Sequence, residues 1–309
     1  MSDTVVSVQG LAKSYGGAPA LRGISFAVRP GEIFALLGPN GSGKTTTLES
    51  LEGIRRPDAG TLSVGGVDPI RQQRRLRSII GVQLQTSGLP AAMTVEEAMT
   101  FFCSYHGVRP RHDLVQRLGL EEKRGVQYGQ LSVGQQRRLA LAIAVAHDPR
   151  IIFLDEPTAG LDVQSRTDLH GLVRELRDKG STVILATHDM AEAEKLADRA
   201  AILLAGRIAA LGSPRELTAA GDRRTRISVS TRDGRLLAAA PAFPGATAQA
   251  GTDGYALYLS DSPGRAVRAI LGWLEEKGDD LLDLRVERPS LEERFLEITA
   301  DTNQKGATL

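Results

Sequence analysis

The chain has 309 residues and a formal net charge of +1; hydrophobic residues make up 41% and charged residues 24%, as in an ordinary globular protein. This near-neutral balance argues against a nucleic-acid-binding protein, which would carry a basic surface. One cysteine, Cys103, excludes an intrachain disulfide, and no uninterrupted apolar stretch reaches the roughly 18 residues that a membrane span needs.

Short apolar runs that end at turn residues recur through the first 210 or so positions. They cover residues 33–37, 151–154, 183–186 and 202–204, and helical patterns cover 45–52, 163–178 and 190–197. Continuous apolar runs are typical of strands buried on both faces of a parallel sheet. Alternation of such strands with helices predicts an α/β fold with a parallel core.

The segment GPNGSGKT, residues 38–45, lies between a predicted strand and a predicted helix. Glycines let a loop curl so that its N–H groups point at phosphate oxygens, and the helix start adds positive potential. Lys44 would place its charge on the β- and γ-phosphates, and Thr45 would offer its hydroxyl to Mg²⁺. The residues expected to bind the nucleotide here are Gly38, Pro39, Asn40, Gly41, Ser42, Gly43, Lys44, Thr45 and Thr46.

Residues 86 to about 148 have a different hydrophobic pattern, which is mostly helical, around 95–105, 113–118 and 133–146. The simplest interpretation is a mainly helical insertion into the α/β core. Arginines are frequent in 71–78, which we interpret as a solvated helix face rather than a nucleic-acid contact, since interleaved aromatic residues are lacking.

Two carboxylates follow the apolar run IIFL, and a histidine follows the run TVILAT. Asp155 would hold Mg²⁺, and Glu156 would orient or deprotonate the attacking water. His188 falls at the carboxyl edge of the predicted sheet, where ligands bind in open α/β folds. It could hydrogen-bond the γ-phosphate and hold that water; a purely structural histidine is the alternative.

Beyond a boundary expected at 220–224, the pattern indicates a small α+β domain over 221–309. Strands are expected at 226–231, 255–260 and 282–286, and helices at 264–277 and 290–298. Ser290 and Glu293 have the spacing of a capping box. Residues 241–254 are rich in Ala, Gly and Pro, and 301–309 are expected to be frayed.

In order, the chain carries GPNGSGKT, Gln85, LSVGQ at 131–135, IIFLDE, AGLD at 159–162 and His188. This ordered set resembles the ATP-binding cassette of ABC transporters, over about residues 4–218. The resemblance implies a P-loop NTPase core at 1–220, a helical signature subdomain at about 86–148, and an accessory domain at 221–309. It implies that Tyr15 stacks on adenine and that Gln85 links Mg²⁺ and the water to a membrane partner.

LSVGQ resembles the family's signature motif, with Val133 where glycine is commonest. In the family this motif closes over ATP held by a second cassette. The resemblance therefore implies a homodimer around two ATP molecules, with Ser132, Gly134 and Gln135 facing the partner's nucleotide and Asp162 along the seam. ATP bound at such an interface favours the closed state, and hydrolysis releases it.

AGLDVQSR and the tail at 288–299 resemble the daunorubicin-resistance group of bacterial ABC exporters. This implies a separate transmembrane permease docked near residues 86–94, export of a drug, antibiotic or lipid, and a peripheral place on the cytoplasmic face of the membrane. The alternative is a soluble cassette ATPase acting on ribosomes or DNA, although one cassette without heptads fits it less well. A small-molecule kinase would leave LSVGQ and AGLD unexplained, and nucleic acid is not an expected partner.

Overall fold

The computed structural model describes residues 4–85, 88–221 and 224–306. The chain divides into two compact units between Pro214 and Arg215. The boundary expected at 220–224 lies a short way beyond this point, with 222–223 outside the described residues. None of the helices in the described part is both long and apolar enough to cross a membrane.

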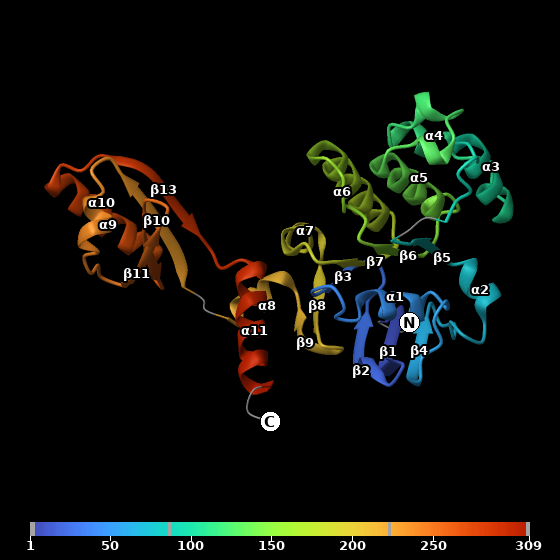
Figure 1. The fold of residues 1–309 in the computed structure, drawn as a ribbon, viewed down its shortest axis with the longest axis horizontal. Coiled ribbons are helices and arrows are strands. Elements are labelled where there is room, and N and C mark those ends of the chain that lie inside the picture. The colour runs from blue at the N-terminus through green and yellow to red at the C-terminus, as the bar shows by residue number, and fades with distance from the viewer. Residues whose placement is uncertain (1–3, 86–87, 222–223, 307–309) are drawn as a thin grey trace. The chain divides into compact units, whose positions relative to one another are not determined.

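The main sheet of the first unit has six strands in the order β5-β6-β7-β3-β8-β9 (Figure 1). All neighbouring strands pair in parallel except β8 and β9, so the predicted α/β fold with a parallel core is confirmed. The bounds are β3 Ile33–Leu37, β5 Ile80–Gln83, β6 Ile151–Asp155, β7 Thr182–Thr187, β8 Arg199–Leu204 and β9 Arg207–Gly212.

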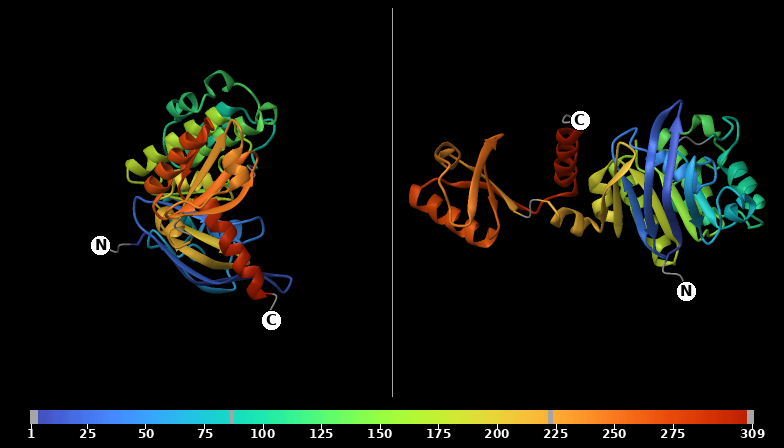
Figure 2. Two further views of the ribbon diagram at one scale, coloured as in Figure 1. Left: turned by 90° about the vertical axis from the view of Figure 1, so that its left-hand side faces the viewer. Right: turned by 90° about the horizontal axis from the view of Figure 1, so that it is seen from below.

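A second sheet of the first unit is antiparallel, in the order β2-β1-β4. Its strands are β1 Val6–Tyr15, β2 Ala18–Val28 and β4 Ala59–Val64, and the view from below in Figure 2 shows these blue strands in front. The sequence pattern did not predict them. Register shifts between Val8 and Leu11 interrupt the pairing of β1, and such bulges break the period-2 alternation that marks a strand.

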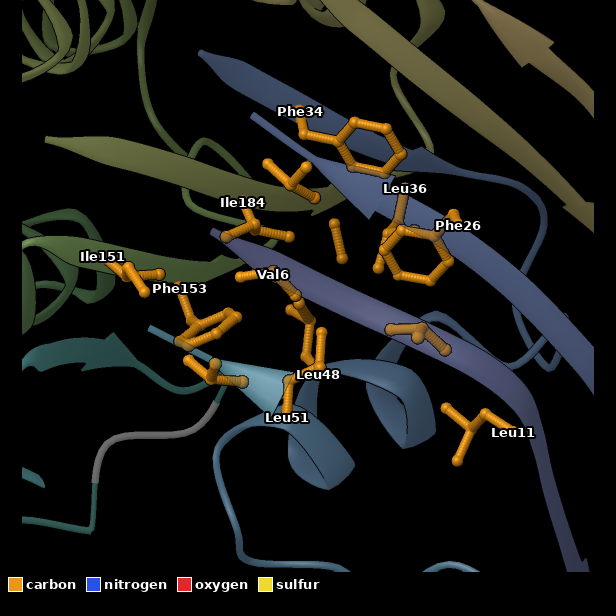
Figure 3. Close-up of a cluster of buried hydrophobic side chains, with 14 of the residues drawn as sticks. Val6, Leu11, Phe26, Phe34, Leu36, Leu48, Leu51, Ile151, Phe153 and Ile184 are labelled. Atoms are coloured by element: carbon orange, nitrogen blue, oxygen red, sulfur yellow. The ribbon is translucent and has the colours of Figure 1, made fainter. Parts of the chain in front are cut away.

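The core of the first unit lies between the two sheets, around α1 (Lys44–Leu51) (Figure 3). Val6 comes from the antiparallel sheet, Phe153 from the main sheet, and Leu48 from α1. Phe26 stacks on Phe34 with ring centroids 5.2 Å apart. Burial of each such side chain stabilises the fold by about 1.5–3 kcal/mol, so this core fixes the helix that begins at the phosphate loop.

Helices between β5 and β6 occupy the predicted insertion, and α3 and α5 pack together. Helix α3 begins with a capping box between Thr94 and Glu97. For α3, α4 and α5, the predicted and observed ranges agree within one residue at each end. The bounds are α2 Gln73–Arg77, α3 Val95–Tyr105, α4 His112–Arg117, η1 Glu121–Lys123, η2 Tyr128–Gln130, α5 Val133–Val145, α6 Val163–Asp178 and α7 Met190–Leu196.

The second unit contains a four-stranded antiparallel sheet in the order β11-β12-β10-β13. Helices α9 and α10 supply the two crossovers, which makes a βαββαβ arrangement. Its core includes Ile227, Tyr258 and Ile270. The bounds are α8 Pro214–Ala219, β10 Thr225–Thr231, α9 Arg235–Ala239, β11 Ala246–Thr252, β12 Tyr255–Ser260, α10 Pro263–Lys277, β13 Leu281–Glu287 and α11 Leu291–Gly306.

The second unit differs from expectation at two places. Strand β11 was not predicted, because its Ala- and Gly-rich sequence has little strand character; it is an edge strand, and pairing with β12 places it. Helix α11 continues to Gly306 through much of the segment expected to be frayed, and 307–309 are outside the described residues. Its predicted capping box is confirmed, because the Glu293 N–H donates to Ser290 Oγ and the Ser290 N–H to Glu293 Oε2.

Candidate functional site

The loop between β3 and α1 curls tightly enough to require glycine at two positions. A Cβ added to Gly38 would lie 2.3 Å from the backbone oxygen of Leu203, and Gly43 has a φ of +107° immediately before the first helical residue. These glycines let the chain turn from a buried strand into a helix while the loop encircles a small space. The geometry is that of a cradle for an anion at a helix start.

Lys44 extends its ammonium group back into this loop. Its Nζ donates to the backbone oxygens of Gly38 at 2.7 Å and Pro39 at 3.1 Å. Burial lowers the pKa of Lys44, and the nearby carboxylates of Glu156 and Asp155 oppose that shift. A lysine held by carbonyl oxygens at the centre of the loop can turn its charge to a phosphate that enters.

Thr45 and Asp155 meet across the edge of the main sheet. The Thr45 hydroxyl donates to Asp155 Oδ2 at 3.0 Å, while Asp155 Oδ1 is buried and has no hydrogen-bond partner among the described residues. Burial raises the pKa of Asp155, and the Thr45 hydrogen bond opposes the shift. A buried carboxylate oxygen without a partner, beside a hydroxyl, fits the oxygen ligands that Mg²⁺ takes when nucleotide phosphates complete its shell.

Glu156 follows β6 with a φ of +48°, and its N–H donates to the backbone oxygen of Ala186 at 2.9 Å. His188 follows the neighbouring strand β7, and its Nδ1 lies 2.9 Å from Glu156 Oε1. Because the carboxyl ends of adjacent parallel strands meet at one edge, the two side chains come together as the sheet topology predicts.

A pocket of about 430 Å³ opens in front of the phosphate loop. It brings together nine of the residues predicted from sequence: Tyr15, Asn40, Gly41, Gly43, Lys44, Thr45, Thr46, Gln85 and Glu156. Gly38, Pro39 and Ser42 form the back of the loop; Ser42 is buried, and its N–H donates to the Pro39 oxygen at 3.2 Å. His188 lines a neighbouring pocket of about 210 Å³ that shares Glu156.

At the outer end of the first pocket, the Tyr15 hydroxyl lies 3.4 Å from Thr46 Oγ1. Arg55 places its guanidinium carbon 5.3 Å from the centre of the Tyr15 ring, and Lys13 approaches the same ring at 5.8 Å. The ring is partly exposed, as a platform for a planar base would be.

The signature residues are not among those that line this pocket. Ser132 caps α5, accepting a hydrogen bond from the Gln135 N–H, while the Gln135 side chain accepts one from the Ser132 N–H. The predicted helix start within LSVGQ is confirmed. Asp162 similarly caps α6, accepting from the N–H and hydroxyl of Ser165 at 2.9 and 2.7 Å.

The sequence pattern missed two arginines at the site. Arg137, in α5, donates to the backbone oxygen of Glu156 and so joins the signature helix to the end of β6. It lies about one turn after Gly134, but a single arginine in a helix forms no motif, so only its contact with Glu156 marks it. Arg55, which approaches Tyr15, falls outside every motif, so nothing in the sequence marked it.

Comparison with known proteins agrees with this geometry. A family model described as ABC transporter matches residues 21–159. The daunorubicin resistance ATP-binding protein DrrA3 of Streptomyces coeruleorubidus is 36% identical, with 97% of this chain and 98% of that protein aligned. The Nod factor export ATP-binding protein I of Burkholderia orbicola is 40% identical over 70% of this chain and 73% of its own length.

Solved structures give the same result for the fold. An ATP-binding subunit of an ABC transporter superposes with a TM-score of 0.66 at 27% identity, covering 70% of this chain and 93% of that chain. The cbiO1 protein of Clostridium perfringens, part of the ABC transporter complex cbiONQ, gives 0.62 at 30% identity, covering 71% and 92%. The chain belongs to the ABC transporter family, as an ATP-hydrolysing, ATP-binding subunit.

Proposed function

We propose that two copies of this chain close around two ATP molecules and that the cycle of closure and hydrolysis drives a separate membrane permease. The observation that carries the proposal is the separation of each ATP site into two parts. The pocket at the phosphate loop has binding and hydrolytic groups, while Ser132, Gly134 and Gln135 lie outside it. A second copy can supply that missing part.

Within one site, each residue has a role. Lys44 and the loop N–H groups hold the β- and γ-phosphates, and Tyr15 stacks on the adenine. Thr45, Asp155 and Gln85 would hold Mg²⁺, which when bound offsets the charge of the phosphate oxygens. Glu156 accepts a proton from the water that attacks the γ-phosphorus, and the bond to the β–γ bridging oxygen breaks to release ADP and phosphate.

His188 orients the Glu156 carboxylate for that step. Its Nδ1–H donates to Glu156 Oε1, which fixes the carboxylate, and leaves Nε2 for the water or a γ-phosphate oxygen. The backbone of Glu156 is also held, because Arg137 donates to its backbone oxygen. Preorganised groups of this kind lower the cost of reaching the transition state.

Exposed apolar side chains support the dimer. Val133, within the signature, is 60% exposed, and Val163, directly after Asp162, is 83% exposed. Large apolar side chains this open are natural contacts for a partner surface. Both lie at the N-termini of the helices that carry the signature and the AGLD segment.

A permease contact is supported by a second pocket of the first unit, which we call the α3 pocket. It has a volume of about 410 Å³ and lies where α3, β5 and the ends of α1 and α5 meet. Phe101 and Tyr105 of α3 stand at its rim. The docking loop expected at 86–94 leads into α3, though 86–87 lie outside the described residues. In this arrangement the chain lies on the cytoplasmic face of the membrane, held by the permease.

Export of a drug, antibiotic or lipid is supported by the relative from Streptomyces coeruleorubidus, whose name refers to daunorubicin resistance. The alignment covers 97% of this chain and therefore extends through the second unit, not only the cassette. The Nod factor relative, also named for export, aligns over 70%.

The proposal is tested with the Glu156→Gln variant, which should bind ATP without splitting it. Sedimentation velocity should show a dimer with Mg²⁺ and ATP and a monomer with ADP. Lys44→Ala, which lacks the phosphate-binding charge, should remain monomeric with either nucleotide. A Glu156→Gln chain that stays monomeric at saturating ATP would argue against the shared site. A multi-span protein that co-purifies from membranes would identify the permease.

A further inference from the structure

The α3 pocket is formed by close packing of the helical part against the edge of the main sheet. A Cβ added to Gly81 of β5 would lie 2.0 Å from the backbone oxygen of Ala144, so β5 and α5 approach at backbone contact. The pocket lies beside this contact, between the C-terminal end of α1 and α3. Most of its lining comes from helices and from β5, and the segments that follow α1 and β5 add Ile54 and Leu84.

The rim of the pocket is apolar and open. Ile54, Leu84, Phe101 and Tyr105 are each between 42% and 61% exposed and all line the pocket. An exposed group of large apolar side chains around a hollow is typical of a surface that another protein covers. The rim by itself would suit any apolar segment.

The floor is different, because it contains a buried carboxyl group. Glu52 follows the last residue of α1 and is only 7% exposed, and neither of its carboxyl oxygens has a hydrogen-bond partner in the described chain. Burial, together with the acidic neighbours Asp155 and Glu49, raises the pKa of Glu52 to about 8. A buried carboxyl group without donors costs stability, and a donor from outside would remove that cost.

A second buried acceptor lines the same pocket. His147 Nε2 lies 3.1 Å from the backbone oxygen of Ile80, so this nitrogen carries the proton and donates. Burial lowers the pKa of His147 to about 4, so the ring is neutral and its Nδ1 has a lone pair. That Nδ1 is buried and has no partner among the described residues. His106 stacks on the ring at 3.7 Å and fixes its orientation.

We infer that the α3 pocket receives a basic side chain from a helix of the membrane partner, with its N–H groups donating to Glu52 and His147 and its apolar flanks on Phe101 and Tyr105. Two unsatisfied acceptors at the floor call for a donor-rich group, and a guanidinium or ammonium has donors but no acceptor. Arg77 of this chain also borders the pocket, but its guanidinium donates to Gln73 at 3.5 Å and not to Glu52 or His147. This inference rests on the proposed permease contact and adds its chemistry.

The test uses the full chain and two small probes, phenethylguanidinium and its neutral analogue phenethylurea. Isoleucine methyl groups are labelled for NMR, because Ile54, Ile80 and Ile143 all line the pocket, while Ile227 in the second unit serves as the reference. Titration should shift the three pocket methyls and not the reference. The titration is carried out at pH 9, above the pKa of about 8, so that Glu52 is ionised in the free chain. The cation should then bind at least about tenfold more tightly than the urea, as a charge-assisted hydrogen bond to a buried carboxylate requires.

The variants separate charge from shape. Glu52→Gln keeps the size of the side chain and should remove the tenfold preference, whereas Glu122→Gln, on an exposed surface, should keep it. Phe101→Ala should weaken both probes alike. Equal binding of the two probes, no binding of either, or a preference that survives in Glu52→Gln would overturn the inference. None of these readouts needs nucleotide or a permease, so failure here is distinct from a failure of ATP-dependent dimerisation.

Discussion

His188 Nδ1 and Glu156 Oε1 are 2.9 Å apart, although the two residues belong to different strands of the main sheet. The contact exists because β6 and β7 are parallel neighbours and each ends at the same edge. It holds Oε1 of the carboxylate, and under the proposed mechanism Oε2 is the oxygen that faces the water. The first two predictions address the two ends of this hydrogen bond.

Replacing Glu156 with Gln should lower ATP turnover by about 10²-fold or more, since a general base contributes this much. The amide keeps the size of the side chain, so ATP affinity should stay close to that of the unmodified chain. Phosphate release and equilibrium ATP binding measure the two effects separately. Near-normal turnover would remove Glu156 from its assigned role.

Replacing His188 with Ala should reduce kcat by about 10-fold or more with a smaller effect on KM, because the carboxylate loses its orientation rather than its base strength. Asn at this position can place an N–H where Nδ1–H lies now, so His188→Asn should retain more activity than His188→Ala. Steady-state kinetics of the pair decide the point. Equal losses in both variants would mean that Nε2, not the Nδ1 hydrogen bond, is what matters.

Much of the first unit could be predicted because local signals and tertiary environment agree there. The β3 strand, α3 and α6 were predicted to the residue, as continuous apolar runs or amphipathic periods bounded by caps. Strand β1 could not be predicted, because its register shifts hide the alternation. Strand β11 is extended because it pairs with β12, and a local sequence pattern does not show such pairing.

The same distinction holds for the site. The phosphate loop, Asp155 and Glu156 form contiguous motifs at predicted strand ends, so sequence alone located them and placed His188 nearby. Arg137 and Glu52 are different, because a single charged residue carries no motif. What distinguishes Arg137 is its contact with the Glu156 peptide, and what distinguishes Glu52 is burial. Both depend on how α5 and α1 pack, which only the folded chain reveals.

The shared-site proposal predicts complementation between two inactive variants. Lys44→Ala loses its own phosphate pocket but keeps an intact signature, whereas Ser132→Arg keeps the pocket and blocks the signature. Each alone should hydrolyse little ATP, and mixing them should restore part of the activity, because one site of the mixed dimer is then complete. ATP binding to the Ser132→Arg monomer should be unchanged.

Circular dichroism of both variants is the necessary control, since Ser132 also caps α5 and loss of such a cap costs about 1 kcal/mol. Additive activities in the mixture, with both variants folded, would show that each chain completes its own site.

Replacing Asp155 with Asn tests the metal ligands. The buried Oδ1 loses its charge, while Thr45 can still hydrogen-bond the amide oxygen. Affinity for ATP with Mg²⁺ should fall by about 10-fold or more, whereas affinity for ATP in the presence of a chelator should change little. Competition with Mn²⁺, followed by electron paramagnetic resonance, measures the metal directly. Equal losses with and without metal would indicate a general disturbance of the pocket instead.

The raised pKa of Glu52 predicts a pH dependence of stability. A free glutamate titrates near 4.5, and the folded chain holds this proton up to about pH 8. Between these values the folded state binds more protons than the unfolded state, so the stabilisation from this group is complete below about pH 4.5 and is lost as the pH rises toward 8. Glu52→Gln removes this dependence, because an amide does not titrate.

Urea unfolding of both chains at pH 5.5 and pH 8 should therefore show a loss of order 1–3 kcal/mol in the unmodified chain that Glu52→Gln lacks. The pKa of His147 is lowered, so its titration changes the stability in the opposite direction as the pH falls. This contribution is the same in both chains and cancels from the comparison. The single tryptophan, Trp273, lies in α10 of the second unit, so its fluorescence should report a transition that the variant leaves unchanged, while circular dichroism reports both units. Parallel pH profiles for the two chains would show that Glu52 is already ionised in the folded state, and hence that its carboxylate has found a donor without a partner protein.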